Sequence, residues 1–597
     1  MWILGLSCFR DDATAALLKD GAVVGIAEEE RFLRVKHAVE RPPGLFVSSL
    51  GESEPLDGFE FRYFPEQSIA YLLTEAGIEP TDLDVVAYDF DFDHRIRHWD
   101  RFLPVSALST AGQNEQAVAV LRHWQRMLAD FARRCGARLE YVPHHLAHAS
   151  GTVFGSGYRE TAFLVMDALG ELESSTLGYF DGDFHVTGTV PLPHSLGIVY
   201  AAVTSFLGFR PFSDEQKTMG LAGYGDPTVF GAEFGRILHP ADAGFETDPD
   251  AVWGSDVIEV DRPPPLAGVL GVPAGPSAAE VCRPPYTHVA AALQQSLEGV
   301  VNHLTDRALA GTGSRRLCLA GGVALNCAAN GTLLRRQDID ELYVQPQAGD
   351  SGTALGAAYY AHFRASGSRP EPLPHAYWGP GYGSGEVRAL LDRLKLPYRR
   401  TDRPWDAAAE LLAGGQLVGW FQGRSECGPR ALGNRSILAH PGSAATRDRV
   451  NAVVKDREWW RPFAASVLAE DRGRYLALDR ESPFMLLTVP LTARGRGDLA
   501  AAGHIDGTTR PQTVSAAVNP RFHRLIRAFQ DRTGIGAVLN TSLNVKHEPI
   551  ANHPLHAIAD LYTTALDALV IEDCVLAKQP QDGSDHAATR VSELAQQ

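Results

Sequence analysis

The sequence has no apolar run that approaches the roughly 18 residues of a membrane-spanning helix. Its first residues, MWILGLSCFRDDATAALL, lack a basic leader, and Arg10 with the two aspartates after it ends the first apolar segment early. Cysteines are also few: there are seven, dispersed and without CxxC spacing. This distribution is typical of a reducing compartment rather than of a disulfide framework. We therefore expect a cytoplasmic protein with no membrane contact.

A basic surface is missing as well. The formal net charge is -17, and binding of nucleic acid or of an anionic membrane requires clustered Lys and Arg. Nucleic acid is therefore not an expected partner, and any anion site must be local. A chain of 597 residues with 45% hydrophobic content is too long for one core and sufficient for two.

Composition suggests where the domains divide. Residues 366–384 are rich in Gly and Pro with little periodicity, which is typical of a linker. They would join a first domain over residues 1–365 to a second domain over residues 385–580. Pro, Asp and Gly also dominate residues 238–284, where we expect an irregular insertion. Residues 581–597 are expected to form a flexible tail.

The first domain contains an approximate internal repeat. Each copy consists of a strand, an acidic turn, a strand, an Asp-Gly hairpin and a strand, over residues 2–30 and again over residues 161–190. This duplication predicts an α/β fold of the actin-like (ASKHA) type, in which the two turns face each other across a cleft and hold nucleotide phosphates. Two unrelated hairpins in a mixed domain are the alternative.

Three segments supply candidate ligand-binding residues, the first two of them for this cleft. The strand LCLA runs through Gly321 and Gly322 into a helix, so that the backbone can approach a ligand and a helix N-terminus can face an anion. Asp350 opens another helix, either as its N-cap or pointing into the same crevice. The segment VPHHLAHAS places His144 and His148 one helical turn apart. These histidines are either a solvated helix start or part of a metal site, depending on carboxylates from elsewhere.

Basic residues concentrate locally in the second domain. GRSECGPRALGNRS and VKDREWWRPFAAS mix cations with Gly-Pro, Trp-Trp and Pro-Phe, which is unusual for a solvated charged face. Guanidinium groups bind phosphate or carboxylate in bidentate geometry. HIDGTTRPQTV and VLNTSLNVKHEPI add an arginine, amides and hydroxyls, so we expect a small-anion site. Residues 424–461 contain the basic residues Arg424, Arg430, Arg435, Arg447, Arg449, Lys455, Arg457 and Arg461, and HIDGTTRPQTV contains Arg510.

Together these segments carry a resemblance to a known family. The motifs occur in the order AEEERF with KH, HHLAHA, QKTMGLA, GGVALN, GDSGTALGAA, GPRALGNRSIL, VKDREWWRPFA, DGTTRPQTV and LNTSLN. Over about residues 1–575 the chain resembles the NodU/CmcH-type O-carbamoyltransferases of nodulation-factor and antibiotic biosynthesis. By that resemblance the first domain is similar to the TsaD-type ATPases of tRNA threonylcarbamoylation, and the second is a YrdC-like α/β domain.

The resemblance implies a reaction in two stages. In the second domain, carbamoyl phosphate is dephosphorylated to carbamate, which attacks ATP to give carbamoyl-adenylate and pyrophosphate. In the first domain, a hydroxyl of a small molecule takes the carbamoyl group. The residues implied to bind carbamoyl phosphate are Lys36, which is also implied to be catalytic, with Arg430, Lys455, Arg461, Arg510, Asn540 and Ser542. Those implied to bind the nucleotide are Lys217, Gly321, Gly322, Val323 and Asn326.

The resemblance also supplies the carboxylates that the two histidines need. Asp167, at the end of the strand FLVMD, and Asp350 match family metal ligands, so the implied metal site is His144, His148, Asp167 and Asp350. This donor set suits Fe(II), Mn or Zn, and the resemblance favours iron. The metal is expected to bind phosphate oxygens and to polarise the adenylate. His145 is expected to point to another face.

In one place the chain departs from the family pattern. Members usually carry His-Asp-Ala-Ser-Ala after the first strand, whereas this chain has RDDATA, so that Asp11 replaces the histidine that helps to deprotonate the acceptor. A carboxylate is a weaker base toward an alcohol than an imidazole. Three explanations are open: Asp11 is the base or orients the acceptor, His37 replaces it, or the activated adenylate needs no strong base. We favour the first.

Two other functions compete with carbamoyl transfer. An actin-like kinase would move the γ-phosphoryl group of ATP to a hydroxyl and release ADP, but it leaves the basic cluster unexplained. A tRNA-modifying or chaperone-like module is disfavoured by the negative charge. The expected acceptor is a hydroxylated small molecule, namely a natural product. A homodimer is possible.

Overall fold

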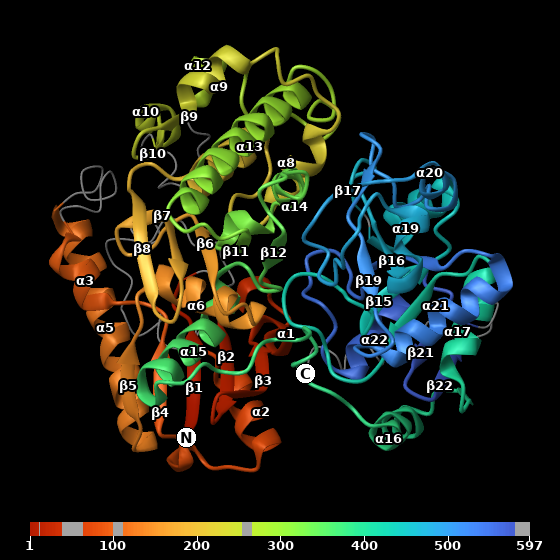
Figure 1. Ribbon diagram of the computed structural model, residues 1–597. Coiled ribbons are helices and arrows are strands. Elements are labelled where there is room, and N and C mark those ends of the chain that lie inside the picture. Colours follow the sequence, from red (N-terminus) through yellow and green to blue (C-terminus); the bar gives the residue numbers. More distant parts are fainter. Residues whose placement is uncertain (11, 39–63, 100–110, 254–264, 456, 579–597) are drawn as a thin grey trace. The chain divides into compact units, whose positions relative to one another are not determined.

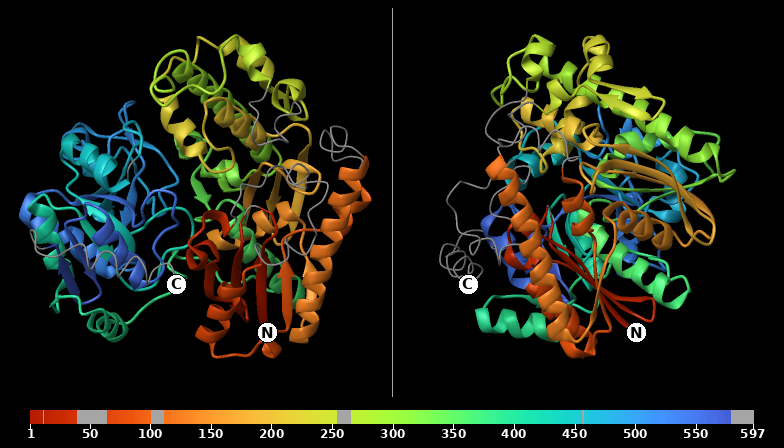
Figure 2. Two further views of the ribbon diagram at one scale, coloured as in Figure 1. Left: turned by 180° about the vertical axis from the view of Figure 1, so that it is seen from behind. Right: turned by 90° about the vertical axis from the view of Figure 1, so that its left-hand side faces the viewer.

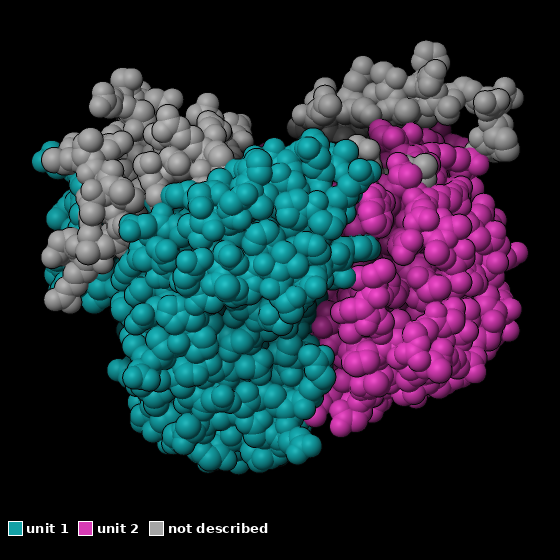
Figure 3. Space-filling model, turned by 90° about the horizontal axis from the view of Figure 1, so that it is seen from above, with its two compact units in different colours: residues 1–30, 37–374 teal, residues 31–36, 375–597 magenta. Residues whose placement is uncertain are grey.

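The chain divides into two compact units, which Figure 3 colours separately. The first comprises residues 1–30 and 37–374, and the second residues 31–36 and 375–597. The boundary after Pro374 falls inside the segment 366–384 for which a linker is predicted. The computed structural model describes residues 1–10, 12–38, 64–99, 111–253, 265–455 and 457–578. Within these ranges no helix is both long and apolar enough to cross a membrane.

Two five-stranded sheets with the same topology form the first unit (Figure 1). The first has the order β3-β2-β1-β4-β5, and the second the order β12-β11-β6-β7-β8. Each begins with an antiparallel meander and adds two strands parallel to its first strand. This duplication confirms the actin-like fold, and the alternative of two unrelated hairpins is wrong. The strands are β1 (Trp2–Ser7), β2 (Thr14–Lys19), β3 (Ala22–Glu28), β4 (Val85–Tyr88), β5 (Arg138–Tyr141), β6 (Thr161–Met166), β7 (Glu173–Phe180), β8 (Phe184–Pro191), β11 (Arg316–Ala320) and β12 (Glu341–Val344).

The two Asp-Gly turns lie at corresponding places in the two sheets. Asp20 and Gly21, between β2 and β3, have φ angles of 51° and 89°, as a type I′ hairpin requires. Asp181 and Gly182 join β7 to β8, and Gly182 has a φ of 124°. Both hairpins are therefore where the sequence predicts them.

Two helices that follow the last strand of each sheet pack directly against each other. They are α6 (His144–Ser156) and α15 (Thr353–Ser366). A Cβ atom on Gly356 would lie 1.8 Å from the carbonyl oxygen of Ala147, so that only glycine fits this crossing. Ser150 Oγ also donates a 2.6 Å hydrogen bond to the Gly356 carbonyl oxygen. The contact fixes the first turns of both helices relative to each other.

Further helices surround these sheets. One of them, α5 (Ala111–Cys135), runs alongside β5 in Figures 1 and 2. The segment 238–284, predicted to be irregular, instead contains two paired strands and two helices in its described part. It folds because it buries side chains such as Trp253, whose Nε1 donates a 2.7 Å hydrogen bond to Pro193 O. The remaining elements are α2 (Glu66–Ala76), α3 (Phe92–Arg97), α5 (Ala111–Cys135), α7 (Leu196–Phe206), α8 (Glu215–Ala222), α9 (Gly231–Ile237), β9 (Leu238–Ala241), β10 (Gly244–Thr247), α10 (Pro249–Val252), α12 (Leu266–Leu270), α13 (Tyr286–Ala310) and α14 (Cys327–Leu333).

The second unit is an α/β domain on a mixed sheet of order β13-β22-β21-β14-β15-β20-β16-β19. Successive residues of β14 point to opposite faces, so that Trp420 packs among residues of α17 and α21, and Phe421 among residues of α16 and α22. Helices therefore cover both faces of the sheet, as predicted for an α/β domain. Its strands are β13 (Arg399–Arg400), β14 (Val418–Phe421), β15 (Arg435–Ala439), β16 (Ala464–Leu468), β19 (Gln512–Val514), β20 (Ala537–Ser542), β21 (Ala568–Ile571) and β22 (Cys574–Ala577), with β17 (Val489–Pro490) and β18 (Thr508–Thr509) paired separately. Its helices are α16 (Ser384–Leu394), α17 (Pro404–Ala413), α18 (Ala444–Val450), α19 (Arg472–Tyr475), α20 (Ala493–Asp498), α21 (Pro520–Thr533) and α22 (Pro554–Thr563).

A short N-terminal segment, residues 31–36, also belongs to the second unit. It starts within helix α1 (Glu30–Leu33). Arg31 donates hydrogen bonds to the carbonyl oxygens of Glu426 and Gly428. Arg34 donates to Glu548 Oε2 at 2.8 Å. Lys36, two residues after Arg34, belongs to the same unit.

Candidate metal and anion sites

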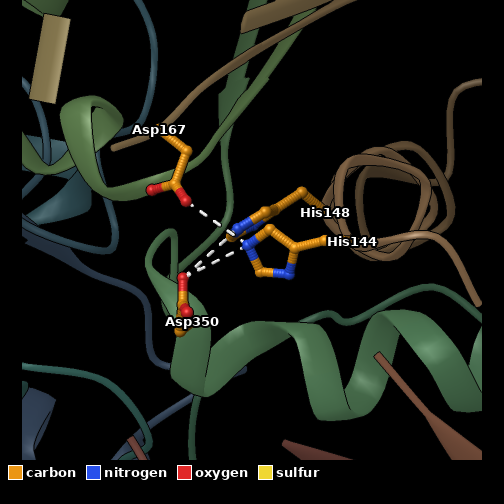
Figure 4. Close-up of side chains that lie close together, drawn as sticks. All are labelled: His144, His148, Asp167 and Asp350. Carbon is orange, nitrogen blue, oxygen red and sulfur yellow. Dashed lines mark hydrogen bonds and ion pairs between the residues drawn. The ribbon is translucent and has the colours of Figure 1, made fainter. Parts of the chain in front are cut away.

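Four side chains far apart in the sequence come together in the first unit (Figure 4). His144 and His148 lie on the first turns of α6, Asp167 directly follows β6, and Asp350 opens a short 3-10 turn before α15. Their candidate ligand atoms all lie within 4.8 Å of one another. These are the four residues that the sequence analysis grouped as metal ligands.

The geometry of this cluster fits a bound divalent metal. His144 Nε2 is 3.3 Å from Asp167 Oδ2, and both His144 Nε2 and His148 Nε2 are 3.5 Å from Asp350 Oδ1. All four side chains are buried. Neither ring nitrogen of His148 has a hydrogen-bond partner among the described residues. Because buried polar atoms are rarely left without a partner, this donor set is suited to a cation.

The surrounding charges keep the two carboxyl groups ionised. Burial would raise the pKa of Asp350, but Arg10 and the two histidines outweigh it and hold that pKa well below its usual range. Burial and Asp350 also oppose ionisation of Asp167, whereas the histidines lower its pKa overall. Ionised carboxylates are the form that ligates a metal.

Arg10 and Asp89 lie next to this cluster, and neither was among the predicted site residues. Arg10 Nη2 donates a 2.7 Å hydrogen bond to Asp89 Oδ2 and lies 3.0 Å from His144 Nδ1 and 3.4 Å from Asp350 Oδ2. Thr353 Oγ1 also donates to Asp89. Asp89 directly follows β4, and a carboxylate just beyond a parallel strand is the sequence signal that could have found it.

Glu171 holds the N-terminus of α6 in place. Its Oε1 accepts hydrogen bonds from the backbone N–H groups of His144 at 2.9 Å and Asp91 at 2.8 Å. Burial and Glu173 raise the pKa of Glu171 to about 7. His145 points elsewhere, with Nδ1 at 2.8 Å from Thr176 Oγ1.

The predicted glycine pair lies beside the same cluster. Gly321 has a φ of 92°, and a Cβ atom there would lie 2.1 Å from the Met166 carbonyl oxygen. The N–H of Gly322 donates a 2.8 Å hydrogen bond to Asp167 Oδ1. Val323 follows in a 3-10 turn, residues Gly322–Leu325. The backbone therefore approaches the cluster as closely as the Gly-Gly motif suggests.

Two other residues predicted to bind nucleotide contact protein groups. Asn326 caps α14 by accepting a hydrogen bond from Ala329 N, and its side chain exchanges hydrogen bonds with Gln294. Lys217, on α8, lies 2.9 Å from Asp214 Oδ2. Their contacts with nucleotide stay predictions.

A cluster of cations occupies the second unit. Lys455 Nζ donates to the carbonyl oxygen of Ser542, to its Oγ at 3.3 Å and to Asn544 Oδ1 at 2.6 Å. Burial lowers the pKa of Lys455 well below its usual range, and Arg457, Lys36 and Arg461 lower it further. Lys36 and Lys455 are therefore near each other, as the predicted carbamoyl-phosphate site requires.

Arg457 extends this cation cluster, although the sequence analysis gave it no individual role. Burial lowers the pKa of Arg457 well below its usual range, and Arg461 and Arg510 add to the effect. Its guanidinium lies over the Phe463 ring at 4.3 Å. Glu458 offsets part of this positive charge, with its Oε2 3.8 Å from Arg461 Nη1, and the charge that remains suits an anion.

Polar groups predicted for the anion site make hydrogen bonds within the second unit. Asn540 Nδ2 donates a 2.9 Å hydrogen bond to Ser466 Oγ, whereas its buried Oδ1 has no partner in the described part of the chain. The loop after Arg430 is held by Glu426, whose Oε1 accepts hydrogen bonds from the backbone of Leu432 and Asn434.

Other arginines of the predicted basic run have structural contacts instead. Arg435 is fully buried over the Phe421 ring and donates to four backbone carbonyl groups. Arg424 donates to the carbonyl oxygens of Trp378 and Gly379. Arg449 pairs with Asp567 at 2.8 Å, and Arg447 with Asp448 at 3.0 Å. The basic residues of this segment therefore fall into two groups: candidates for the anion site, and residues that stabilise the fold.

Comparison with known proteins identifies the class to which this chain belongs. The family model described as Carbamoyltransferase N-terminus matches residues 2–359, and the model described as Carbamoyltransferase C-terminus matches residues 409–578. The chain therefore belongs to the carbamoyltransferase family, of the NodU/CmcH type that its motifs resemble.

Several named relatives illustrate this membership. Nodulation protein NolNO of Sinorhizobium fredii is 36% identical over 96% of this chain and 81% of its own. Nodulation protein NolO of Bradyrhizobium diazoefficiens is 38% identical over 75% of this chain and 81% of its own. The 3'-hydroxymethylcephem-O-carbamoyltransferase of Amycolatopsis lactamdurans is 38% identical over 43% of this chain and 48% of its own.

Proposed function

We propose that the protein is an ATP-dependent O-carbamoyltransferase. It takes the carbamoyl group from carbamoyl phosphate, forms carbamoyl-adenylate and transfers the group to a hydroxyl of a small natural product. The observation that carries this proposal is the presence, in one chain of this family, of a buried His–Asp cluster in the first unit and a cation cluster in the second. A kinase reaction would explain the His–Asp cluster but would leave the cation cluster without a function. The relatives named as cephem O-carbamoyltransferases support a hydroxymethyl or similar acceptor.

The first stage belongs to the second unit. Water replaces the phosphate of carbamoyl phosphate, which leaves carbamate and inorganic phosphate. Pre-positioned cations and amides bind the dianion and stabilise the departing phosphate. A carbamate oxygen then attacks the α-phosphorus of ATP, and pyrophosphate leaves. The residues proposed for carbamoyl phosphate are Lys36, Arg430, Lys455, Arg461, Arg510, Asn540 and Ser542.

The second stage belongs to the first unit. The acceptor oxygen bonds to the carbonyl carbon of carbamoyl-adenylate, and the bond from that carbon to AMP breaks. A divalent metal held by His144, His148, Asp167 and Asp350 would supply positive charge for phosphate oxygens and would polarise the adenylate. Iron is favoured by the family resemblance over Mn or Zn. The residues proposed for the nucleotide are Lys217, Gly321, Gly322, Val323 and Asn326.

Asp11, the residue expected to deprotonate or orient the acceptor, lies outside the described residues. Its role stays a prediction that Asp11→Asn can test.

Product analysis tests the proposed function. The enzyme is incubated with labelled carbamoyl phosphate, ATP and a panel of hydroxylated metabolites. We expect AMP, pyrophosphate and one labelled carbamate ester. Formation of ADP with a phosphorylated acceptor would instead identify a kinase.

A further inference from the structure

We propose that His37, oriented by Asp12, is the catalytic base that takes the proton from the acceptor hydroxyl. The inference rests on the proposed function and adds a residue to its second stage. His37 Nδ1 lies 2.8 Å from Asp12 Oδ1, and both residues belong to the first unit. The two side chains are 35% and 23% exposed, so that they form a polar pair that a ligand can reach rather than a core contact.

The position of His37 is fixed through its backbone as well as its ring. Its N–H donates a 2.9 Å hydrogen bond to Glu30 Oε2. Its φ of 61° lies in the left-handed region, which residues other than glycine adopt rarely and keep only where their surroundings hold them. Asp12 at the ring and Glu30 at the backbone therefore hold the imidazole in one orientation.

The bond to Asp12 determines which nitrogen accepts a proton. A carboxylate can accept only from a protonated Nδ1, and in that tautomer the lone pair of the neutral ring is on Nε2. The same carboxylate stabilises the imidazolium that forms after proton transfer. A base that is oriented by a third group is the arrangement that activates hydroxyl groups in many transferases and hydrolases.

The turn between β1 and β2 connects this pair to the His–Asp cluster. Arg10 contacts His144 and Asp350, and Asp12 contacts His37. Because consecutive Cα atoms are about 3.8 Å apart, the Cα atoms of Arg10 and Asp12 are separated by less than about 7.6 Å. One short turn therefore carries a group at the metal cluster and a group at the proposed base.

Helix α8 carries a group that interacts electrostatically with the same histidine. Glu215, at the first position of α8, is half-buried; desolvation raises its pKa to about 7, while His37 acts to lower it. Lys217, a residue proposed for the nucleotide, is on the same short helix. His37 thus lies among elements that the proposed function assigns to the adenylate.

The proposed step transfers one proton and one carbamoyl group. The O–H bond of the acceptor breaks, and its proton goes to Nε2 of His37. The acceptor oxygen forms a bond to the carbonyl carbon, the bond from that carbon to the AMP phosphate oxygen breaks, and AMP leaves with that electron pair. Asp11 would then orient the acceptor, which is the second of the roles expected for it.

His37→Gln tests the assignment because glutamine can still donate to Asp12 but cannot take a proton. The alcohol probe is the panel compound that the wild-type enzyme carbamoylates fastest. The second probe is hydroxylamine, which attacks as a neutral amine without prior loss of a proton. We expect His37→Gln to lose about 100-fold or more in transfer to the alcohol. Carbamoyl-phosphate-dependent exchange of pyrophosphate into ATP and transfer to hydroxylamine should stay within about twofold of wild type, and the retained exchange shows that the variant is folded.

Two further variants make the result specific. Asp12→Asn should lose about 10-fold or more in transfer to the alcohol, since it no longer stabilises the imidazolium. His185→Gln removes another His–Asp pair, in which His185 Nε2 lies 2.9 Å from Asp181 Oδ1 on the β7–β8 turn, and should change none of the three rates.

The outcomes separate this inference from the proposed function. Wild-type enzyme that shows no pyrophosphate exchange would contradict the proposed function itself. Normal exchange in all variants, with near wild-type transfer to the alcohol by His37→Gln and a large loss in Asp11→Asn, would overturn the role of His37 alone and assign the proton to Asp11. Equal losses of His37→Gln with alcohol and with hydroxylamine would also overturn it.

Discussion

His148 Nε2 lies 3.5 Å from Asp350 Oδ1, yet neither ring nitrogen of His148 has a hydrogen bond in the described parts of the chain. The histidine comes from α6 and the aspartate from the turn before α15, two helices that meet at Gly356. Packing of the two halves of the first unit thus creates a buried donor set that a cation would complete.

We expect the purified enzyme to carry about one divalent metal per chain, and His148→Ala to lose both the metal and carbamoyl transfer. The reason is that the ion would bind phosphate oxygens of the adenylate. Elemental analysis beside the transfer assay measures both. The control is His185→Ala, which removes an exposed imidazole near the start of β8. An empty site in fully active enzyme would exclude a metal role.

Gly356→Ala should destabilise the first unit by about 1–3 kcal/mol and weaken metal binding, because the new methyl group would force α6 and α15 apart. Gly299→Ala is the matched control, since an added Cβ on that residue of α13 meets no atom within 4 Å. That variant should gain up to about 1 kcal/mol from helix propensity. Thermal unfolding and metal content measure both effects. Equal behaviour of the two variants would show that the helix crossing does not position the ligands.

Arg430→Ala and Lys455→Ala should abolish carbamate formation but leave transfer from externally supplied carbamoyl-adenylate intact. Both cations are proposed for the first stage alone, so the two stages should separate. Arg447→Ala, which removes a cation paired with Asp448 outside the cluster, should retain both stages. If Arg430→Ala and Lys455→Ala lose both stages equally, their assignment to the first stage is wrong.

The buried carboxyl group of Asp560 makes the stability of the second unit depend on pH. Burial raises the pKa of Asp560 to about 7, and its Oδ2 has no hydrogen-bond partner among the described residues. A raised pKa in the folded state contributes stability that is present below the ordinary value of about 4 and is lost as the pH rises through about 7.

Asp560→Asn should therefore gain stability relative to wild type as the pH rises from about 4 to 8. The gain is a few kcal/mol at most, since one pKa unit corresponds to about 1.4 kcal/mol. Urea unfolding at both pH values measures it, with the exposed Asp402→Asn as the control. A difference between Asp560→Asn and wild type that does not change with pH would contradict the assigned pKa shift.

Local patterns were sufficient to predict the three-stranded meanders of the first unit and their hairpins. In both hairpins, strands of alternating polarity flank an Asp-Gly turn. The turns form because Asp20, Gly21 and Gly182 can adopt the positive φ angles that are required. The four-residue cluster was predicted only through resemblance, because spacing along the chain relates His144 to His148 but relates neither of them to Asp167 or Asp350.

The contacts that sequence analysis missed depend on the three-dimensional fold. Arg10 meets Asp89 only because β1 and β4 are neighbours in the sheet. In GPRALGNRS, Arg435 resembles an anion-site residue. In the structure its guanidinium instead donates hydrogen bonds to backbone carbonyl groups and so stabilises the surrounding loops. Residues 31–36 join the second unit through hydrogen bonds to distant backbone carbonyls, which no local pattern reports.

Exchange of labelled pyrophosphate into ATP tests whether the enzyme forms carbamoyl-adenylate. Carbamate and ATP form carbamoyl-adenylate and pyrophosphate reversibly in the proposed first stage. We therefore expect label to enter ATP when carbamoyl phosphate is present and not to enter when it is omitted. Absence of exchange in active enzyme, with ADP as the nucleotide product, would contradict a carbamoyl-adenylate intermediate.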